Sequence, residues 1–378
     1  MADQKDPERN PSSIANHDVA SGSGPQISES GHPSSSVNQL EGDTAEEHDS
    51  PGHAEIDSSY GDAEFDTNSI TDTLASSVKR FREEHGRTYH SYGGERSTGL
   101  KAFASNRHLE ISILMLRGSH HFWTLILEGK LFLAPVKSLQ KVLDLGTGTG
   151  IWAMDVADQY PSAVVKGMDL SPIQPLWTAP NAVFEVDDYN HTAFDVSPNH
   201  DLIHARELLG SVLDWPRLLR KCFNGLTPGG WIECVEPDIK VTSNHMPLPA
   251  DDPNAQWVEV FREVGQQTGM TFEAAVRLKD WLEKAGFENV EEVVFPIAVG
   301  SWPRDKKQKE LGMWNQVRLA NGMRDFTERR MRNSLGKQDV EIEALIARSR
   351  AAVQDSNLYT HQNMSVSLFS KAFTYNLT

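Results

Sequence analysis

The chain has 378 residues and a formal net charge of −17 at pH 7, and it is long enough for one large or two ordinary domains. Residues 1–66 carry 15 acidic side chains against only Lys5 and Arg9, a net charge of −13, so most of the acidity belongs to this segment. The rest of the chain is nearly neutral, which argues against a broad nucleic-acid-binding surface. The two cysteines, Cys222 and Cys234, have no metal-ligand spacing and are too few for a disulfide framework, which favours a reducing compartment.

The amino terminus shows no targeting pattern. The first 20 residues contain no apolar run of the kind that a signal peptide needs. The longest apolar stretch, residues 108–135, is interrupted by Glu110, Arg117, Glu128 and Lys130, which argues against a membrane span. We therefore expect a soluble protein of the cytoplasm or nucleus, with neither a membrane nor nucleic acid as a partner.

Composition divides the first 136 residues into two parts. Residues 1–66 are rich in Ser, Gly, Asp, Glu and Pro and show no period, so we expect a disordered acidic tail. Residues 69–85 space their apolar side chains for one helical face, and a second apolar helical stretch lies within 119–133. The interpretation is an amino-terminal helical cap over residues 67–136.

From Lys141 onward, short β-rich runs alternate with helical runs. This alternation is typical of a parallel sheet that is covered by helices on both faces. The predicted strands are 141–145, 163–169, 182–186, 201–205 and 230–237, and the predicted helices between them are 152–160 and 215–226. The fold class is therefore expected to be α/β, with a doubly wound domain over residues 137–378.

The carboxyl-terminal part adds helices and two further strands. Helices are expected at 252–267 and 277–287, within a helical insertion of about 245–288. Strands at 290–300 and 363–376, with helices at 305–321 and 339–355 between them, would extend one edge of the sheet. The prediction is a Rossmann-like sheet of seven strands, most of them parallel.

A glycine-rich loop joins the first strand of this domain to its helix. Gly146, Gly148 and Gly150 stand at alternate positions, where bare amides and a helix amino terminus can approach an anionic group. A P-loop would need Lys followed by Ser or Thr after the last glycine, but Ile151 and Trp152 stand there. Ile151 also occupies the place of the third glycine of a dinucleotide fingerprint. The spacing therefore excludes both phosphate-binding patterns.

Acidic residues mark the ends of three of these strands. Asp144 lies directly before the glycine loop, where it would repel a pyrophosphate but attract a cationic group such as the α-ammonium of S-adenosylmethionine. Asp169 ends the next strand, where a carboxylate can accept both hydroxyls of a ribose. Asp187 and Asp188 follow the third strand, where one of them could accept from an adenine amino group. These positions predict S-adenosylmethionine as the cofactor.

With these motifs the sequence resembles the class I S-adenosylmethionine-dependent methyltransferases, and more narrowly their fungal LaeA-like group. The resemblance is carried by "GRTYHSY" (86–92), "HHFWTLILEGKLFLAP" (120–135), "VLDLGTGTGIWAMDVADQYPSAVVKGMDLSPIQPLW" (142–177), "FEVDDYN" (184–190), "DLIHARELLGSVLDWPRLL" (201–219) and "LTPGGWIECVE" (226–236). It implies that the methionine part is bound by Asp144, Gly146, Gly148 and Gly150, the ribose by Asp169 with Leu170, and the adenine by Asp188 with Asp187.

The catalytic residues are not fixed by the sequence. Transfer from a sulfonium needs alignment and exclusion of water, and a general base only for some acceptors. The candidates at the open edge of the sheet are His204, Arg206, Glu236 and His121 with its neighbour His120. Each also has a structural interpretation: a hydrogen-bonded core histidine, a paired arginine, a strand-end charge and an amphipathic helix face. No metal is required by this chemistry.

Three functions remain open. The first is a methyltransferase that modifies a small-molecule acceptor in fungal secondary metabolism. The second is a LaeA-like nuclear regulator of secondary metabolite gene clusters that acts through partner proteins. The third is a cofactor-binding protein without turnover, because residues 94–118 and 361–378 depart from the family pattern.

Overall fold

A computed structural model describes residues 81–84, 87–90, 118–243, 248–249 and 251–372. The chain divides into two compact units, Met1–Asn68 and Ser69–Thr378, and all described residues belong to the second. The expected acidic tail at 1–66 and most of the expected first helix lie outside the described residues. No helix in the described part of the chain is long and apolar enough to cross a bilayer.

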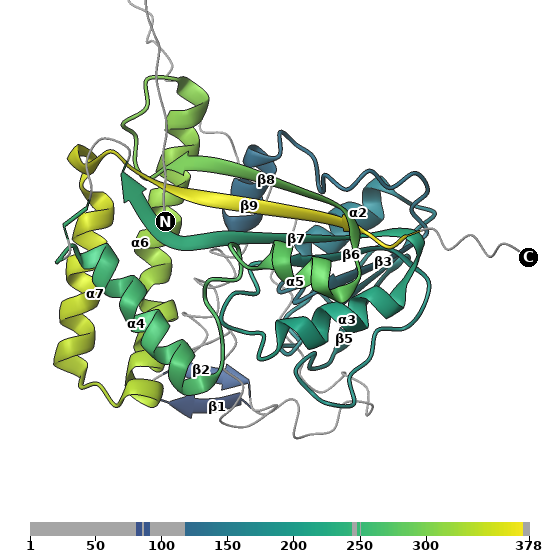
Figure 1. Cartoon of the computed structure of the whole chain (residues 1–378), viewed down its shortest axis with the longest axis horizontal. Helices are drawn as coiled ribbons and strands as arrows, with labels where there is room; N and C mark the ends of the chain where they lie inside the picture. The colour runs from purple at the N-terminus through teal and green to yellow at the C-terminus, as the bar shows by residue number, and fades with distance from the viewer. Residues whose placement is uncertain (1–80, 85–86, 91–117, 244–247, 250, 373–378) are drawn as a thin grey trace, which may run out of the picture. The chain divides into compact units, whose positions relative to one another are not determined.

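A seven-stranded sheet forms the centre of the described unit (Figure 1), with strand order β5-β4-β3-β6-β7-β9-β8. The five strands from β5 to β7 are mutually parallel, whereas β9 runs antiparallel to both of its neighbours. The mostly parallel Rossmann-like sheet and the two added edge strands are thus confirmed. The strands are β3 (Lys141–Leu145), β4 (Val164–Asp169), β5 (Ala182–Val186), β6 (His200–Arg206), β7 (Leu226–Ser243), β8 (Glu288–Ala298) and β9 (Thr360–Ser370).

The strand order places the predicted loops at one edge of the sheet. From β3 the chain proceeds to β4 and β5 on one side, and then returns to β6 and β7 on the other. In open parallel sheets, ligands bind at the carboxyl ends of the strands where the order reverses in this way. The glycine loop, which follows β3, therefore lies at the place where this topology forms a binding crevice.

Helices cover the two faces of the sheet, as the alternating pattern predicts. The helices are α2 (Ile151–Gln159), α3 (Trp215–Gly225) and α5 (Leu278–Ala285). One core surrounds Trp152 and Trp123, the second of which comes from helical residues 118–126, and the other surrounds Trp215 and Leu282. Asp214 begins α3 by accepting a hydrogen bond from the Arg217 N–H, a favourable amino-terminal cap.

A bundle of three helices forms a third core beside the sheet. In Figure 1, β7 and β9 run from the sheet to this bundle, which consists of α4 (Pro253–Thr268), α6 (Lys306–Leu335) and α7 (Asp339–Gln354). Its core includes Phe261, Met323 and Ile346, together with Ile239 of β7. The short helix η2 (Ser356–Leu358) leads from α7 into β9.

Three local predictions are wrong. The helix expected over 69–85 does not reach His85, because Phe81–Glu84 (β1) pairs antiparallel with Arg87–His90 (β2). Here pairing between strands overrides a weak local preference for helix. Helix α6 continues to Leu335 rather than ending at residue 321, since Gly322 lies buried within the helix. Strand β7 begins at Leu226 and runs to Ser243, well beyond the predicted 230–237.

Candidate functional site

The glycine loop adopts a backbone that glycine alone readily provides. Gly146, Gly148 and Gly150 have φ angles of 68°, 62° and 81°, all in the left-handed region. A Cβ atom on Gly146 would lie 2.4 Å from a methyl group of Leu208, and one on Gly150 would lie 2.5 Å from the ring of Phe184. The loop is therefore packed tightly between β5 and the segment that follows β6.

Asp144 lies beneath this loop and is almost completely buried. One carboxylate oxygen accepts from the Thr147 hydroxyl at 2.6 Å, and the other lies 2.8 Å from Nδ1 of His204. The His204 ring is stacked on the Trp152 indole, with 3.7 Å between the ring centroids. Burial lowers the pKa of His204, while the hydrogen bond to Asp144 raises it. The predicted binding residue and the predicted catalytic residue are thus direct partners.

Asp169 connects the ends of two neighbouring strands. Its carboxylate accepts hydrogen bonds from the Gly148 and Ser171 N–H groups, both at 2.8 Å. Gln174 adds a second connection, since its side-chain amide donates to the Gly148 carbonyl at 2.6 Å and to the Ser171 carbonyl at 3.0 Å. The residue expected to bind a ribose therefore also holds the glycine loop in place.

Asp187 and Asp188 follow β5 at the same edge, half-buried. One oxygen of each carboxylate accepts a local hydrogen bond, that of Asp187 from the Asp188 N–H and that of Asp188 from the Asn190 N–H. The backbone N–H of Asp187 donates to the Asp169 carbonyl at 3.2 Å, so the two predicted carboxylate positions are adjacent. Leu170 is half-buried directly after Asp169. The structure thus brings all of the predicted cofactor-binding residues to one end of β3, β4 and β5.

The remaining catalytic candidates have different surroundings. His120 is buried and lies 2.8 Å from Asp155 through Nε2 and 3.2 Å from Arg206 through Nδ1. Burial lowers the pKa of Arg206, although Asp144 and other carboxylates oppose this effect. His121 is exposed, with its ring 5.0 Å from that of Trp314 in α6. His120 therefore faces the sheet, whereas His121 does not.

Glu236 and Glu233 are completely buried and bind backbone amides. Glu236 accepts from the Leu208 N–H at 2.7 Å and from the Leu209 N–H at 3.1 Å, and it thereby holds the segment after β6. Burial raises its pKa to about 8, against the opposing effect of the Leu208 N–H. Glu233 accepts from the chain at 133–134, and burial raises its pKa to about 7. Both carboxyl groups position main chain near the site.

Sequence reasoning missed Glu207, the residue that follows β6. Its φ angle is 54°, unusual for a residue other than glycine. Its carboxylate accepts from the Ser119 hydroxyl at 2.8 Å and the Trp123 indole at 3.1 Å, and it forms an ion pair with Arg318 at 3.5 Å. No sequence signal marks this residue, because its partners come from positions 84 to 111 residues away.

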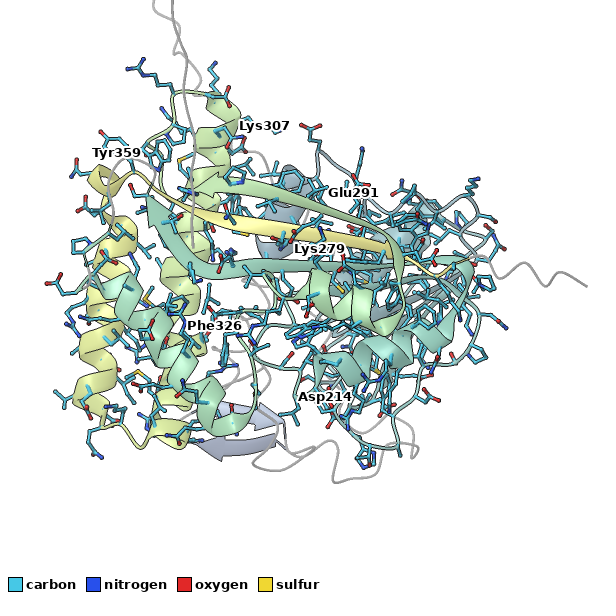
Figure 2. The ribbon with its side chains drawn as sticks, viewed as in Figure 1. Asp214, Lys279, Glu291, Lys307, Phe326 and Tyr359 are labelled. Carbon is cyan, nitrogen blue, oxygen red and sulfur yellow. The ribbon has the colours of Figure 1, made fainter. Side chains whose placement is uncertain are left out.

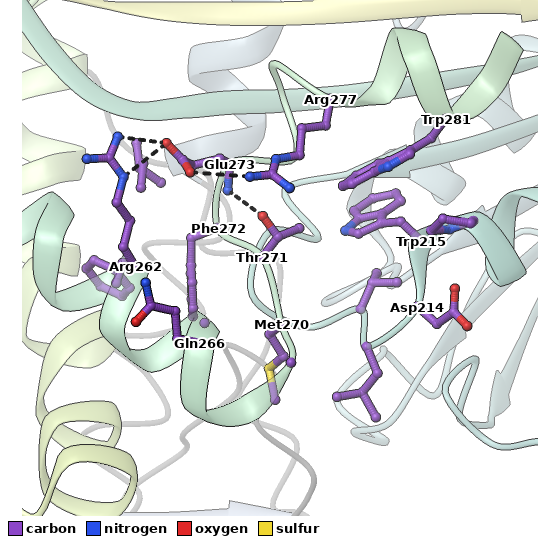
Figure 3. Close-up of a pocket in the computed structure, with 17 residues that line it drawn as sticks. Asp214, Trp215, Arg262, Gln266, Met270, Thr271, Phe272, Glu273, Arg277 and Trp281 are labelled. Atoms are coloured by element: carbon purple, nitrogen blue, oxygen red, sulfur yellow. Dashed lines mark hydrogen bonds and ion pairs between the residues drawn. The ribbon is translucent and has the colours of Figure 1, made fainter. Parts of the chain in front are cut away.

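Two cavities adjoin this region. The larger, of about 630 Å³, lies between the start of α3, α4 and the chain leading into α5 (Figure 3), a volume in the range of small-molecule sites. Glu273 lies in its wall and pairs with Arg262 at 3.0 Å. The smaller, of about 30 Å³, is lined by Glu207 and Arg318 among mostly apolar side chains. Among the described residues, no group of three or more His, Cys, Asp and Glu could hold a metal.

The residues around the glycine loop fit S-adenosylmethionine by the chemistry of their side chains. Carboxylates at the ends of successive strands can accept from an ammonium group, from ribose hydroxyls and from an adenine amino group. The Ser171 hydroxyl is completely buried beside Asp169 and has no hydrogen-bond partner in the described part of the chain. Such an orphaned donor is costly unless a ligand or water completes it.

Comparisons with known proteins agree with this architecture. The family model described as "Methyltransferase domain" matches residues 119–292. The chain is 38% identical to methyltransferase pytC of Aspergillus terreus over 283 residues, which covers 74% of this chain and 85% of that protein. It is 37% identical to the secondary metabolism regulator LAE1 of Cochliobolus heterostrophus, covering 55% of this chain and 70% of that one. The chain therefore belongs to the fungal LaeA-like family of class I methyltransferases.

Proposed function

We propose that this protein binds S-adenosylmethionine at the glycine loop and transfers its methyl group to a small-molecule acceptor in fungal secondary metabolism. The observation that carries the proposal is the convergence of Asp144, Asp169 and Asp188 with the glycine loop at one edge of the sheet. In this arrangement the carboxylate of Asp144 would attract the α-ammonium group, Asp169 would accept from the ribose and Asp188 from the adenine.

The proposed cofactor supplies an activated methyl group on a positively charged sulfur. The protein then contributes alignment of donor and acceptor and exclusion of water, rather than a covalent nucleophile. Two features support this role. His204 and Trp152 fix the position of Asp144, and the network of His120 with Arg206 and Asp155 fixes the helical residues 118–126 over the sheet.

A regulatory role is the second candidate, favoured by the similarity to LAE1. The longer match to the methyltransferase pytC, which spans 74% of this chain against 55% for LAE1, supports the small-molecule methyltransferase. Metabolite profiling of a strain that lacks the gene separates the two. One compound shifted by the mass of a methyl group supports the enzyme, whereas the silencing of many gene clusters supports the regulator.

Calorimetric titration of the purified full-length protein with S-adenosylmethionine tests cofactor binding. We expect a single site, and at least tenfold weaker binding by Asp169→Ala. Asp280→Ala is a matched control, because Asp280 is an exposed carboxylate on α5 that pairs only with Lys284 in the described structure. Absence of binding by the wild-type protein would remove the proposal. Binding without methylation of any compound in extracts of the deletion strain would instead support a cofactor-binding protein without turnover.

A further inference from the structure

We propose that Glu207 and Arg318 form the polar end of the methyl-acceptor site and bind a neutral hydroxyl group on an otherwise apolar molecule. This inference rests on the proposed function and names the class of acceptor. It is carried by the position of the two residues, by their unused hydrogen-bonding capacity and by the apolar walls around them.

Glu207 lies next to the proposed cofactor loop. Strands β3 and β6 are neighbours, with Leu145 opposite Ala205, so Gly146 and Glu207 continue from adjacent strand ends. The same segment reaches the loop through Leu208, whose side chain occupies the space above Gly146. An acceptor group held by Glu207 would thus be close to the cofactor that the loop is proposed to hold.

The backbone and side chain of Glu207 are held in a fixed orientation. Its left-handed backbone is fixed by its N–H, which donates to the Val235 carbonyl at 2.9 Å. Its carboxylate is oriented by donors on Ser119 and Trp123 as well as by Arg318. Backbone strain in a residue other than glycine concentrates at functional sites, where surrounding contacts maintain it. Three donors leave at least one lone pair of the carboxylate available.

Arg318 offers the complementary donor. It projects from α6 and is largely buried, with 16% of its side chain exposed. One terminal nitrogen donates to Asn315 at 3.1 Å and to Gln362 at 2.7 Å, while the other pairs with Glu207. Its Nε atom is buried and has no hydrogen-bond partner among the described residues. The guanidinium also lies over the Phe122 ring, 5.4 Å from its centroid.

These two residues select a neutral group that both donates and accepts. A hydroxyl group can donate its hydrogen to the Glu207 carboxylate while its oxygen accepts from Arg318. A carboxylate on the ligand would face Glu207, and an ammonium group would face Arg318, so either charge would meet repulsion in a site of low polarity. The opposite charges of Glu207 and Arg318 balance, which favours a neutral partner.

Apart from Gln362, which accepts from Arg318, apolar side chains form the rest of the inner cavity. Its lining includes Leu209, Pro237, Ile239, Trp257, Phe261, Phe272, Leu319, Met323 and Phe326. In Figure 2, Phe326 extends from α6 toward the centre of the described unit. Walls of this kind favour an acceptor whose remaining atoms are apolar.

The inner cavity and the larger pocket are neighbours that are separated by shared walls. The two share Ile239, Phe261 and Phe272 in their walls. In Figure 3, Phe272 lies beside Thr271 on the side of the pocket opposite Trp215. The Phe272 ring is packed 4.7 Å from Phe261 and 5.1 Å from the Arg330 guanidinium. An acceptor that enters from the larger pocket would displace Phe272 to reach Glu207.

The test compares 2-naphthol with 2-methoxynaphthalene, in which a methyl group replaces the hydrogen of the hydroxyl group and so removes the donor. Binding to the full-length protein is measured by calorimetry without cofactor. We expect the wild-type protein to bind 2-naphthol at least tenfold more tightly than 2-methoxynaphthalene. Glu207→Gln and Arg318→Gln should each reduce this preference below threefold. Phe272→Ala should strengthen the binding of both probes equally and keep the preference.

Matched controls use exposed residues of the same types. Glu310→Gln on α6 and Arg304→Gln just before it should leave the preference unchanged, since both side chains are exposed. If Glu207→Gln fails to fold, Arg318→Lys carries the test, because it retains the positive charge but removes the Nε donor. The inference would be overturned if the wild-type protein bound both probes equally or bound neither. It would also be overturned if the preference for 2-naphthol were retained in the variants of both Glu207 and Arg318.

The cofactor titration separates this inference from the proposed function. The variants Glu207→Gln and Arg318→Gln should bind S-adenosylmethionine within threefold of the wild-type affinity. If the wild-type protein does not bind S-adenosylmethionine, the proposed function is contradicted, regardless of how the two probes bind. Normal cofactor binding without discrimination between the probes contradicts only the assignment of Glu207 and Arg318.

Discussion

The imidazole ring of His204 lies parallel to the indole ring of Trp152, with 7° between their planes and 3.7 Å between their centroids. Trp152 belongs to the first turn of α2, and its indole N–H donates to the Leu131 carbonyl at 2.7 Å. The stacked pair therefore connects three segments: the chain at Leu131, helix α2 after the glycine loop, and strand β6. It also directs Nδ1 of His204 at Asp144.

Two substitutions separate the stacking of His204 from its hydrogen bond. His204→Phe keeps an aromatic ring on Trp152 but leaves a buried oxygen of Asp144 without this partner. We expect a loss of about 1–3 kcal/mol in the free energy of unfolding, the typical penalty for such a buried group. His204→Asn can retain a donor to Asp144, so it should preserve cofactor affinity better than His204→Phe. Urea unfolding and calorimetry measure the two effects; better cofactor binding by the Phe variant would contradict this account.

The buried carboxyl of Glu236 makes stability depend on pH. Its pKa is raised to about 8 in the folded protein, whereas the pKa of a glutamate in the unfolded chain is about 4.3. Between these values the folded state retains a proton that the unfolded chain has released, so the free energy of unfolding should fall as pH rises. The contribution of this group is complete below about pH 4 and is lost above about pH 8, with a slope of up to about 1.4 kcal/mol per pH unit.

Glu236→Gln should remove this part of the pH dependence. Urea unfolding between pH 5.5 and 8 should show a smaller decrease in stability for the variant than for the wild type. Glu310→Gln, an exposed change on α6, should have the wild-type slope. A variant that follows the wild type throughout this range would show that Glu236 titrates normally.

Gly146 should tolerate alanine poorly for two separable reasons. Its backbone φ of 68° is costly for any residue with a Cβ, and that Cβ would lie 2.4 Å from the Leu208 side chain. We expect Gly146→Ala to destabilise the fold by about 1–3 kcal/mol. Adding Leu208→Ala removes the contact but not the backbone cost, so the double variant should be more stable than the sum of the single changes predicts. Thermal unfolding tests this; strict additivity would show that the contact contributes nothing.

Gln174 is expected to act through the glycine loop. Its side-chain amide donates to both the Gly148 and the Ser171 carbonyls. Gln174→Leu removes both hydrogen bonds while keeping a side chain of similar size. We expect three- to tenfold weaker binding of S-adenosylmethionine, with a change of about 1 kcal/mol or less in the stability of the fold. Calorimetry and urea unfolding of the same samples compare the two. An unchanged affinity would show that this connection does not control the loop.

Local pattern predicted much of the fold. The strands β3 and β5 match the predicted ranges, because short, mostly apolar runs bounded by turns are strong local signals. The prediction ended α6 at residue 321, but the helix continues through Gly322, which is buried within it, because tertiary packing outweighs the low helix propensity of glycine. Likewise, the pairing of β7 with β9 connects residues more than 100 positions apart, and no local pattern reveals how far it continues.

The candidate site likewise contains residues that the sequence predicts and contacts that it does not. Asp144, Asp169 and the glycines follow from their order along the chain, since parallel strands bring their carboxyl ends to one edge. The proximity of Asp144 to His204 depends on which strands are neighbours, and that of Glu207 to Arg318 depends on where the helical bundle packs. These contacts are set by tertiary packing, and a single sequence does not reveal them.

Strand β7 is continuous from Leu226 to Ser243, and it contributes to both the central sheet and the core of the bundle. Its first part pairs with β6 beside the glycine loop, whereas Val241 packs in the core of the helical bundle. The two parts of the proposed site are thus connected by a single strand, whose pairing with β9 shifts in register between Pro237 and Val241. Exchange of α4, α6 and α7 for those of another family member is therefore a route to change the proposed acceptor preference while the glycine loop and the strands around it are left as they are.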